Sequence, residues 1–561
     1  GCQAIWLKAE AQGVARAVLR AWGCPMAVAA FGVAAQGASE VPAMPMLAVR
    51  AAAPSALRPG CRADGGGLGL LGRRPPPPRP PLPQCWRRRR GLPLLARALG
   101  ALLCAGPVSV SGQGGFGGAG MGFGGQTPRL GNCPESGPWP GLLQEVERGV
   151  QAFQVGRFAD AKAILSTAAE AATMDVRSAF GCSLGISSLF RALAFAFCAD
   201  PQLQGRALRR ANQIGLRFLH LAMNWLTHTF VSTGHDQPLI DGSAWPISIQ
   251  EINDDLTAVA NAIRSNGPQG HAPTLAGSVL HHTYSQPKLR IAIVSLCTYP
   301  PEHPLPKYSA SNQGMYADRH GYAHVLEKEM VDTNRPPAWG KVKLVEKEVR
   351  SGDWDWVVWA DCDTYFMNMS VTLDSVLYTY AGRPKAGSSE LELDPAVHMI
   401  VQEDAAMLNS GIFFIRCSDW AINLLQRVWG SDDSPWINHP WWENAAMGWE
   451  FLKDNPQKFM DEDLLEFAAS GEDDLAGVYP PEVRVAPQTH FNSYHPVTSR
   501  FLHDTWEEGK FVIAFNGVLS GSSQAVVNVL YGTYYQTACR LNGVEDRCVA
   551  VDPALPWDVG P

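Results

Sequence analysis

The chain has 561 residues, of which 46% are hydrophobic and 18% are charged, so it is long enough for two or more globular domains. Its formal net charge of −7 argues against nucleic acid as the main partner.

The 13 cysteines do not indicate a disulfide scaffold in a chain of this length, and no Cys/His cluster has zinc spacing. Cys539 and Cys548 flank a short polar loop, where they either form a disulfide or stay free core thiols.

Residues 1–130 are predicted to be a low-complexity leader. The segment is rich in Ala at its start, and it contains the run Pro75–Pro78 and the Gly-rich stretch Gly112–Gly125. Such a composition cannot bury enough apolar surface to fold.

A basic cluster precedes an apolar segment inside this leader, near residues 87–110. Arg87–Arg90 is followed by the apolar stretch Ala98–Val110, which resembles a secretory signal or a type II membrane anchor. Its uninterrupted apolar part is about a dozen residues, which is short for a spanning helix. We expect a signal or an anchor here; a disordered leader and an Arg-rich organelle transit segment are the alternatives.

Residues 131–275 are predicted to be helical. Apolar side chains recur at four-residue steps at Leu142, Val146 and Val150, as on one face of an amphipathic helix. The segment 149–162 resembles a tetratricopeptide helix pair in its placement of Gly and Ala, but the several in-register copies of a solenoid are not found. We therefore predict a helical domain of unknown role that is a candidate site for a protein partner.

The pattern changes over residues 286–540, where strands and helices are expected to alternate. Leu289–Ser295 is typical of a buried strand, a helical stretch follows through Met330, and a further helix is expected over Trp339–Val349. This alternation predicts an α/β sandwich large enough for one nucleotide-binding catalytic domain. Residues 541–561 are expected to form a C-terminal tail.

Two carboxylates follow a buried apolar strand of this domain. The stretch that starts at Trp354 ends in Asp361 and Asp363, and side chains two residues apart in an extended chain point the same way. Ligands of open α/β sheets bind at the carboxyl ends of strands. Mg²⁺ and Mn²⁺ prefer oxygen ligands, so this Asp-x-Asp motif is a candidate site for a divalent cation on a nucleotide diphosphate. An Asp-rich turn is the simpler alternative.

Several segments taken together resemble glycosyltransferase family 34, the galactosyl-, mannosyl- and xylosyltransferases of the fungal and plant Golgi. Their order and rough spacing both fit, and the resemblance covers about Leu289 to Gly517. The matching segments are Ser311–Tyr322, Arg335–Lys341, Trp359–Asp363, Gln402–Arg416, Trp442–Ala446, Phe491–Tyr494 and Glu508–Gly517.

The resemblance implies a GT-A fold and a metal-dependent transferase that moves a sugar with retention at the anomeric carbon. It implies Mn²⁺ or Mg²⁺ as the cofactor, a nucleotide-sugar donor that is more often a UDP-sugar than a GDP-sugar, and a glycan or glycoprotein acceptor. It also implies a Golgi or secretory-pathway membrane location with the catalytic domain in the lumen.

Most candidate site residues lie in the matching segments. Gln402, Asp404 and Asn409 are expected to hold sugar hydroxyls, and Gly411 is expected to let the backbone approach the sugar closely. Turn residues around a strand are the alternative. The remaining candidates for donor or acceptor binding are Asn312, Tyr316 and Lys341; the last either meets a phosphate or is a solvated charge.

The position that matches Glu443 and Asn444 lies near the anomeric carbon in the family. Negative charge or an amide oxygen there stabilises an oxocarbenium-like state, so Glu443, Asn444 and Asp404 are the candidate catalytic residues. Other family members often have Asp-Asp-Gln or Glu-Glu-Gln at this place, so the amide of Asn444 is one methylene shorter.

One departure from the family pattern concerns the metal. Members commonly carry His-Phe-x-Gly-Cys-Lys near the end of the domain, where this chain has Ala514 and Leu519 in place of the His and the Lys. Either the ion is held by the two aspartates, the diphosphate and water, with help from His495 or His503, or the site is weakened. The alternative to the enzyme is therefore a degenerate transferase-like protein that acts as a binding or scaffold module through its helical domain.

Overall fold

The computed structural model describes residues 133, 137–233, 249–265 and 288–551, apart from short gaps at 301, 389, 405–406, 461, 471, 473–474, 476, 497–504, 517 and 519–523. The predicted leader, including the candidate signal or anchor at 87–110, lies outside these residues, as do His503 and Leu519. Within the described residues, no helix is long and apolar enough to cross a bilayer.

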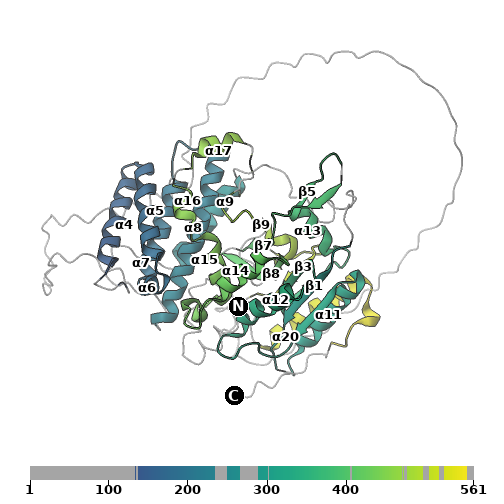
Figure 1. Ribbon diagram of the computed structural model, residues 1–561. Coiled ribbons are helices and arrows are strands. Elements are labelled where there is room, and N and C mark those ends of the chain that lie inside the picture. The colour runs from purple at the N-terminus through teal and green to yellow at the C-terminus, as the bar shows by residue number, and fades with distance from the viewer. Residues whose placement is uncertain are drawn as a thin grey trace, which may run out of the picture. The chain divides into compact units, whose positions relative to one another are not determined.

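Helices alone form the first part of the described chain (Figure 1). The long helix α8 packs against both α7 and α9, and α4 and α7 each pack against α5. These helices are α4 (Trp139–Gln154), α5 (Phe158–Thr173), α6 (Val176–Phe180), α7 (Ser183–Cys198), α8 (Gly205–Thr233) and α9 (Ile249–Ser265).

A six-stranded mixed sheet forms the centre of the second part, in the order β2-β1-β3-β8-β7-β9. β1 is parallel to both β2 and β3, whereas β8 runs antiparallel to β3 and β7, and β9 is parallel to β7. The strands are β1 (Ile291–Leu296), β2 (Ala323–Glu327), β3 (Trp356–Ala360), β7 (Met399–Glu403), β8 (Leu408–Arg416) and β9 (Val483–Ala486).

Two smaller sheets flank it. One has the order β10-β11-β4, with β4 (Thr364–Phe366), β10 (Ser493–Tyr494) and β11 (Val512–Ala514), and the other is the pair β5 (Gly382–Pro384) and β6 (Leu391–Leu393). The helices of this part are α11 (Pro304–His320), η2 (Pro337–Trp339), α12 (Gly340–Ser351), α13 (Leu373–Ala381), α14 (Asp419–Trp429), η3 (Pro435–Asn438), α15 (Trp442–Leu452), α16 (Asn455–Lys458), α17 (Leu464–Ser470), α18 (Gln488–Phe491), α20 (Gln524–Asn542) and η4 (Glu545–Arg547).

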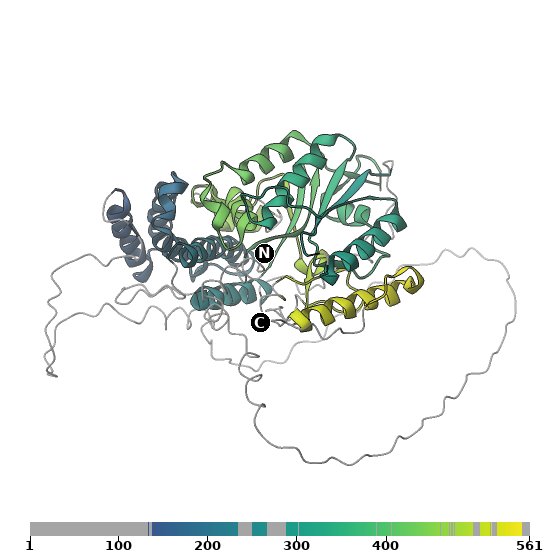
Figure 2. The same cartoon turned by 90° about the horizontal axis from the view of Figure 1, so that it is seen from below.

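The two faces of the main sheet belong to two separate hydrophobic cores, because alternate side chains of a strand point to opposite faces. Ala292 and Val294 of β1 pack in one core with α12, α14 and α15, and Ile291 and Ile293 pack in the other with α11, α13 and α20. Figure 2 shows strands between the yellow helix α20 and the green helices. The first core continues without a break into the side chains of α4 to α9.

The predicted α/β class with a helical region before it is confirmed. One local expectation was wrong: the stretch through Met330 is not helical throughout, because α11 ends at His320 and Gly321 takes φ +67°. The following segment pairs with β1 as the edge strand β2. A left-handed glycine ends a helix because it carries no Cβ to clash.

Six cysteines of the described chain are paired, as Cys133–Cys182, Cys297–Cys362 and Cys539–Cys548. Of the two alternatives for Cys539 and Cys548, the structure has the disulfide. The other two pairs carry no spacing signal in the sequence, since 49 and 65 residues separate their partners.

The contact between α7 and α8 depends on Gly215. A Cβ at this position would lie 2.2 Å from the Cys198 sulfur and 3.1 Å from the Ala194 carbonyl oxygen. We expect Gly215→Ala to lower the free energy of unfolding by about 1–3 kcal/mol, because overpacking forces backbone shifts.

Gly141 is the matched control, because nothing lies within 4 Å of its ideal Cβ. Gly141→Ala should stabilise helix α4 by up to about 1 kcal/mol. Urea melts of both variants measure these changes, and equal stability of Gly215→Ala and the wild type would contradict the close approach of α7 and α8.

Candidate functional site

Asp361 and Asp363 lie just past the carboxyl end of β3, as the sequence predicts. Asp361 has its Oδ1 3.1 Å from Lys341 Nζ and accepts a hydrogen bond from Trp359 Nε1 at 2.7 Å, and its own amide donates to the Gly411 carbonyl at 2.8 Å. Burial raises the pKa of Asp363 to about 6, and the neighbouring Asp361 carboxylate adds to the rise. Two half-buried carboxylates of like charge favour a cation between or beside them.

The loop that carries the pair is fixed by contacts to β1 and α11. Cys362, the residue between the two aspartates, is joined to Cys297 by a disulfide. Gln313 Nε2 donates to the carbonyls of Asp361 and Thr364 at 3.2 and 3.3 Å. These contacts hold the backbone on both sides of the Asp-x-Asp motif, so that the carboxylates are placed before any ligand binds.

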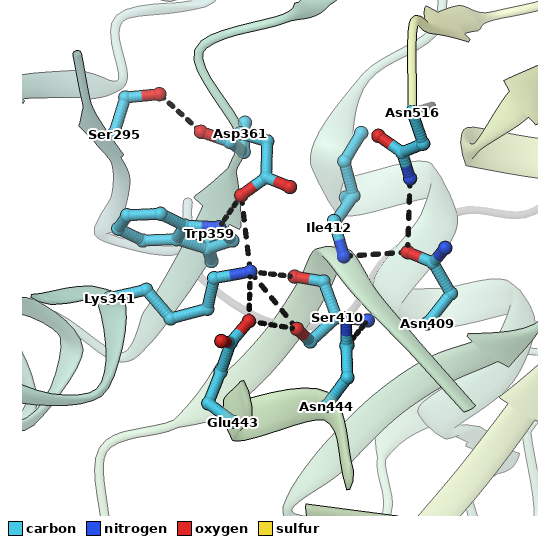
Figure 3. A network of polar contacts seen from close by, with 12 residues as sticks. Ser295, Lys341, Trp359, Asp361, Asn409, Ser410, Ile412, Glu443, Asn444 and Asn516 are labelled. Carbon is cyan, nitrogen blue, oxygen red and sulfur yellow. Dashed lines mark hydrogen bonds and ion pairs between the residues drawn. The ribbon is translucent and has the colours of Figure 1, made fainter. Parts of the chain in front are cut away.

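A buried ammonium group joins this loop to two other segments (Figure 3). Lys341 Nζ lies 3.1 Å from Asp361 Oδ1 and 2.9 Å from Glu443 Oε1, and it donates to the Ser410 carbonyl and hydroxyl at 3.0 Å each. Burial alone would lower the pKa of Lys341, but the Asp361 and Glu443 carboxylates outweigh it and raise that pKa. Lys341 is therefore a buried charge, and the alternative of a solvated charge is wrong.

Glu443 and Asn444 lie in the first turn of α15. Glu443 Oε1 accepts from the Ser410 hydroxyl at 3.1 Å, while its Oε2 is buried without a hydrogen-bond partner among the described residues. Asn444 Oδ1 accepts from the Ser410 amide at 2.7 Å. Trp442, just before them, has φ +42°, a left-handed backbone that a Trp rarely adopts.

Asp404, Asn409 and Gly411 gather at the β7–β8 end of the sheet. Asn409 Nδ2 donates to Asp404 Oδ2 at 3.0 Å, and the Tyr494 hydroxyl donates to the same oxygen at 2.7 Å. Asn409 Oδ1 accepts from the Gly411 amide at 2.7 Å and from Asn516 Nδ2 at 3.4 Å. A Cβ on Gly411 would lie 2.9 Å from Asn409 Oδ1 and 3.3 Å from Asp361 Oδ2, so glycine keeps this polar surface open.

Three predicted binding residues are fully buried and contact protein atoms. Gln402 Nε2 donates to the Ile412 carbonyl at 2.8 Å, next to the register shift in the β7–β8 pair. The Tyr316 hydroxyl donates to the Val371 carbonyl at 2.8 Å. Asn312 Nδ2 donates to the Phe366 carbonyl, and Asn312 Oδ1 accepts from the Phe366 amide. In this structure these side chains hold backbone groups of the protein through hydrogen bonds.

Three further residues of the site, Ser410, Tyr494 and Asn516, were not predicted from the sequence. All three lie within segments that carry the family resemblance, so the only signal was their position inside those motifs. Their roles depend on which side chains the fold brings beside them, which the spacing along the chain does not reveal.

The donor atoms of the site suit Mg²⁺ or Mn²⁺ in kind, because they are carboxylate oxygens. No group of three or more His, Cys, Asp or Glu side chains that could hold a metal ion occurs in the described part of the chain. Ala514 of β11 pairs with Thr364, directly after Asp363, and the Phe515 amide donates to the Asp363 carbonyl at 3.0 Å. Around Asp361 and Asp363, a diphosphate and water could supply the remaining ligands of a cation.

Residues 291–524 match the model of the galactosyl transferase GMA12/MNN10 family. This region of the chain is similar to that family. The match covers all the site residues described above and begins after the helices α4 to α9, so the helical region is outside the GMA12/MNN10 domain.

Two individual proteins are similar to parts of the chain. A probable alpha-1,6-mannosyltransferase, MNN10 of Saccharomyces cerevisiae (strain ATCC 204508 / S288c), is 28% identical over 142 residues, which are 22% of this chain and 35% of that protein. The chain thus spans about a third of the length of that curated relative. A crystal structure of a glycosyltransferase involved in the glycosylation of the major capsid of PBCV-1 aligns over 46% of this chain and 100% of its own, at 15% identity and a TM-score of 0.28.

We expect Lys341→Met to be strongly destabilising. It leaves Glu443, which is 2% exposed, buried without its cation, and breaking a buried pair in this way costs about 3–5 kcal/mol. Lys347→Met is the control, because Lys347 lies on the same helix and is 70% exposed; it should change the free energy of unfolding by less than about 0.5 kcal/mol. Urea melts measure both, and similar losses in the two variants would show that the buried ammonium has no special role.

Proposed function

We propose that the chain is a metal-dependent retaining glycosyltransferase that moves a hexose or pentose from a nucleotide diphosphate sugar to a glycan or glycoprotein acceptor. The observation that carries the proposal is the joining of three separate segments at one point. Asp361 after β3, Ser410 of β8 and Glu443 of α15 all lie within hydrogen-bond distance of Lys341. The match of residues 291–524 to the GMA12/MNN10 family supports it.

The charged residues of the site have different proposed roles. Asp361 and Asp363 would hold Mg²⁺ or Mn²⁺, which supplies neutralisation of the departing diphosphate. Glu443 is a carboxylate in a water-poor site, where fixed negative charge stabilises a developing oxocarbenium ion far more than it would in water. Lys341 forms an ion pair with Glu443 at 2.9 Å, and Asn444, fixed by the Ser410 amide, presents its amide group from the same helix turn.

The sugar is proposed to contact the polar cluster of Asp404, Asn409 and Tyr494. These side chains already bond one another, so their remaining lone pairs and protons are fixed in direction. A preordered set of this kind discriminates between hydroxyl arrangements, because a mismatched sugar leaves buried polar groups unpaired. Gly411 at the end of the cluster leaves room for a ligand atom beside Asp361.

A degenerate transferase-like protein remains the second candidate. It is favoured by Ala514, which occupies the strand position beside the Asp-x-Asp motif where the family resemblance implies a metal-binding His. The paired carboxylates and the buried Lys341–Glu443 pair favour the enzyme, since a site without chemistry has no need to bury these charges.

Donor hydrolysis by the full chain tests the proposal. UDP- and GDP-sugars, with mannose donors included because of the MNN10 relative, are incubated with Mn²⁺ or with EDTA. We expect turnover of one donor that is lost with EDTA and falls by at least about 100-fold in Asp363→Asn, because that substitution removes a metal-binding charge.

Asp353→Asn is the matched control, since Asp353 is exposed and lies at the opposite end of β3. It should keep wild-type turnover. Metal-dependent nucleotide binding without turnover would indicate a missing acceptor, whereas no binding and no turnover would favour the degenerate alternative.

We further propose a Golgi or other secretory location with a lumenal catalytic domain. The three disulfides among the described residues support it, because such bonds persist in oxidising compartments. Differential alkylation and mass spectrometry of the protein from its native cells should find Cys297 and Cys362 joined and Cys198 and Cys417 free. Reduced Cys297 and Cys362 in freshly lysed cells would contradict this location.

A further inference from the structure

One face of α8, outside the family domain, lies against two loops that carry site residues. Arg217, His220 and Asn224 lie at three- and four-residue steps, so they share that face. Arg217 and His220 approach Glu403 at the end of β7, and Asn224 contacts the segment 439–445. The core on this side of the sheet is continuous with the core of the helical region.

The first contact is a buried bidentate ion pair. Arg217 Nε and Nη2 lie 2.9 and 2.5 Å from the two Glu403 carboxylate oxygens, and the side chains are 3% and 12% exposed. The Tyr479 hydroxyl also donates to Glu403. Burial lowers the pKa of His220 to about 4, so Arg217 is the cation that balances Glu403.

This pair fixes the residue directly before Asp404. Glu403 is the last residue of β7 and pairs with Leu408 at the start of β8, next to Asn409. A bidentate Arg–carboxylate pair constrains orientation as well as distance. Arg217 of α8 thus constrains, through Glu403, the backbone that positions Asp404 and Asn409.

The second contact spans the segment that carries Glu443. His439 Nδ1 accepts from the Trp441 amide at 3.0 Å, so Nε2 carries the proton and donates to the Asn224 carbonyl at 2.9 Å. At the other end of the segment, Asn224 Nδ2 donates to the Ala445 carbonyl at 3.2 Å. One residue of α8 therefore holds both ends of the segment 439–445.

That segment contains the backbone strain of the site. Trp442 has φ +42°, and a strained residue of this kind persists only where its surroundings over-determine it. Without the two contacts from Asn224, the first turn of α15 would be free to relax. Glu443 and Asn444 would then move away from Lys341 and Ser410.

We infer that Arg217 and Asn224 are positioning residues for the transfer reaction, so that the helical region completes the active site of the family domain. This inference rests on the proposed function. It assigns to α8 the support of the sugar-binding hairpin through Glu403 and of the Glu443–Asn444 turn through the segment 439–445.

Asn224→Leu in the full chain tests the second contact. The substitution keeps the branched shape and the number of side-chain heavy atoms, and it removes the donor to Ala445. Thr227→Val is the control, because the Thr227 hydroxyl donates to the Met223 carbonyl of the same helix. We expect Asn224→Leu to lower kcat by at least about tenfold, with the donor KM within about twofold, because a small misplacement of reacting groups reduces the chemical step more than binding. Thr227→Val should keep wild-type values.

Arg217→Met tests the first contact, with Arg210→Met as its control. Arg210 is equally buried on α8 and forms a bidentate pair with Glu462, at 2.7 and 2.9 Å. Both variants should lower the melting temperature, but only Arg217→Met should lower kcat at a temperature where both are folded. Equal kcat losses in the two variants, or a wild-type kcat in Arg217→Met, would overturn the inference.

Hydrogen exchange separates this inference from the proposed function. The Ser410 amide and the amides of residues 441–445 should exchange faster in Asn224→Leu and at the wild-type rate in Thr227→Val, whether or not the chain turns over a donor. Absence of both turnover and metal-dependent nucleotide binding in the wild type would refute the proposed function. Unchanged exchange in Asn224→Leu would refute the positioning role by itself.

Discussion

The candidate site depends on one buried cation. Lys341 holds Asp361 of the β3 loop, Ser410 of β8 and Glu443 of α15 together, and each of these segments comes from a different part of the chain. A buried ammonium is stable only where carboxylates compensate for its lost hydration. The same holds for Glu443, because a buried carboxylate is also costly without a cation beside it. The three segments are thus bound to one another by a shared electrostatic constraint.

Contacts farther from Lys341 also hold the site residues in place. Asp361 and Asp363 are held by the Cys297–Cys362 disulfide and by Gln313, and Glu443 is held by a strained turn that other contacts must stabilise. Contacts of this kind come from α8, through Asn224 and, at the neighbouring hairpin, Arg217. The helical region therefore shares a hydrophobic core and polar contacts with the family domain. A truncated chain without the helical region would expose this core and lose these contacts.

Several features were open to prediction because they are local. The β3 strand and its Asp-x-Asp end follow from an apolar run that stops at two carboxylates, and the helices before residue 275 follow from their apolar periodicity. The edge strand β2 was missed because its five residues, Ala-His-Val-Leu-Glu, do not alternate strictly between apolar and polar. Its pairing with β1 fixes its conformation. Gln402, Asn312 and Tyr316 stood inside the motifs, but polar residues in a motif serve either a ligand or the backbone, and burial distinguishes the two.

The sequence alone determined the α/β class, the preceding helices and the place of the carboxylate pair, because these depend on residues within a few positions of one another. The tertiary structure alone decided the partners of Lys341, the disulfide at Cys362 and the contacts of α8, since their partners lie between 20 and 221 residues away in the chain. Contacts over such separations depend on how the sheet is ordered and on which faces are buried. The physical cause is that charge compensation and burial are properties of packed neighbours, and no local pattern encodes which neighbours those are.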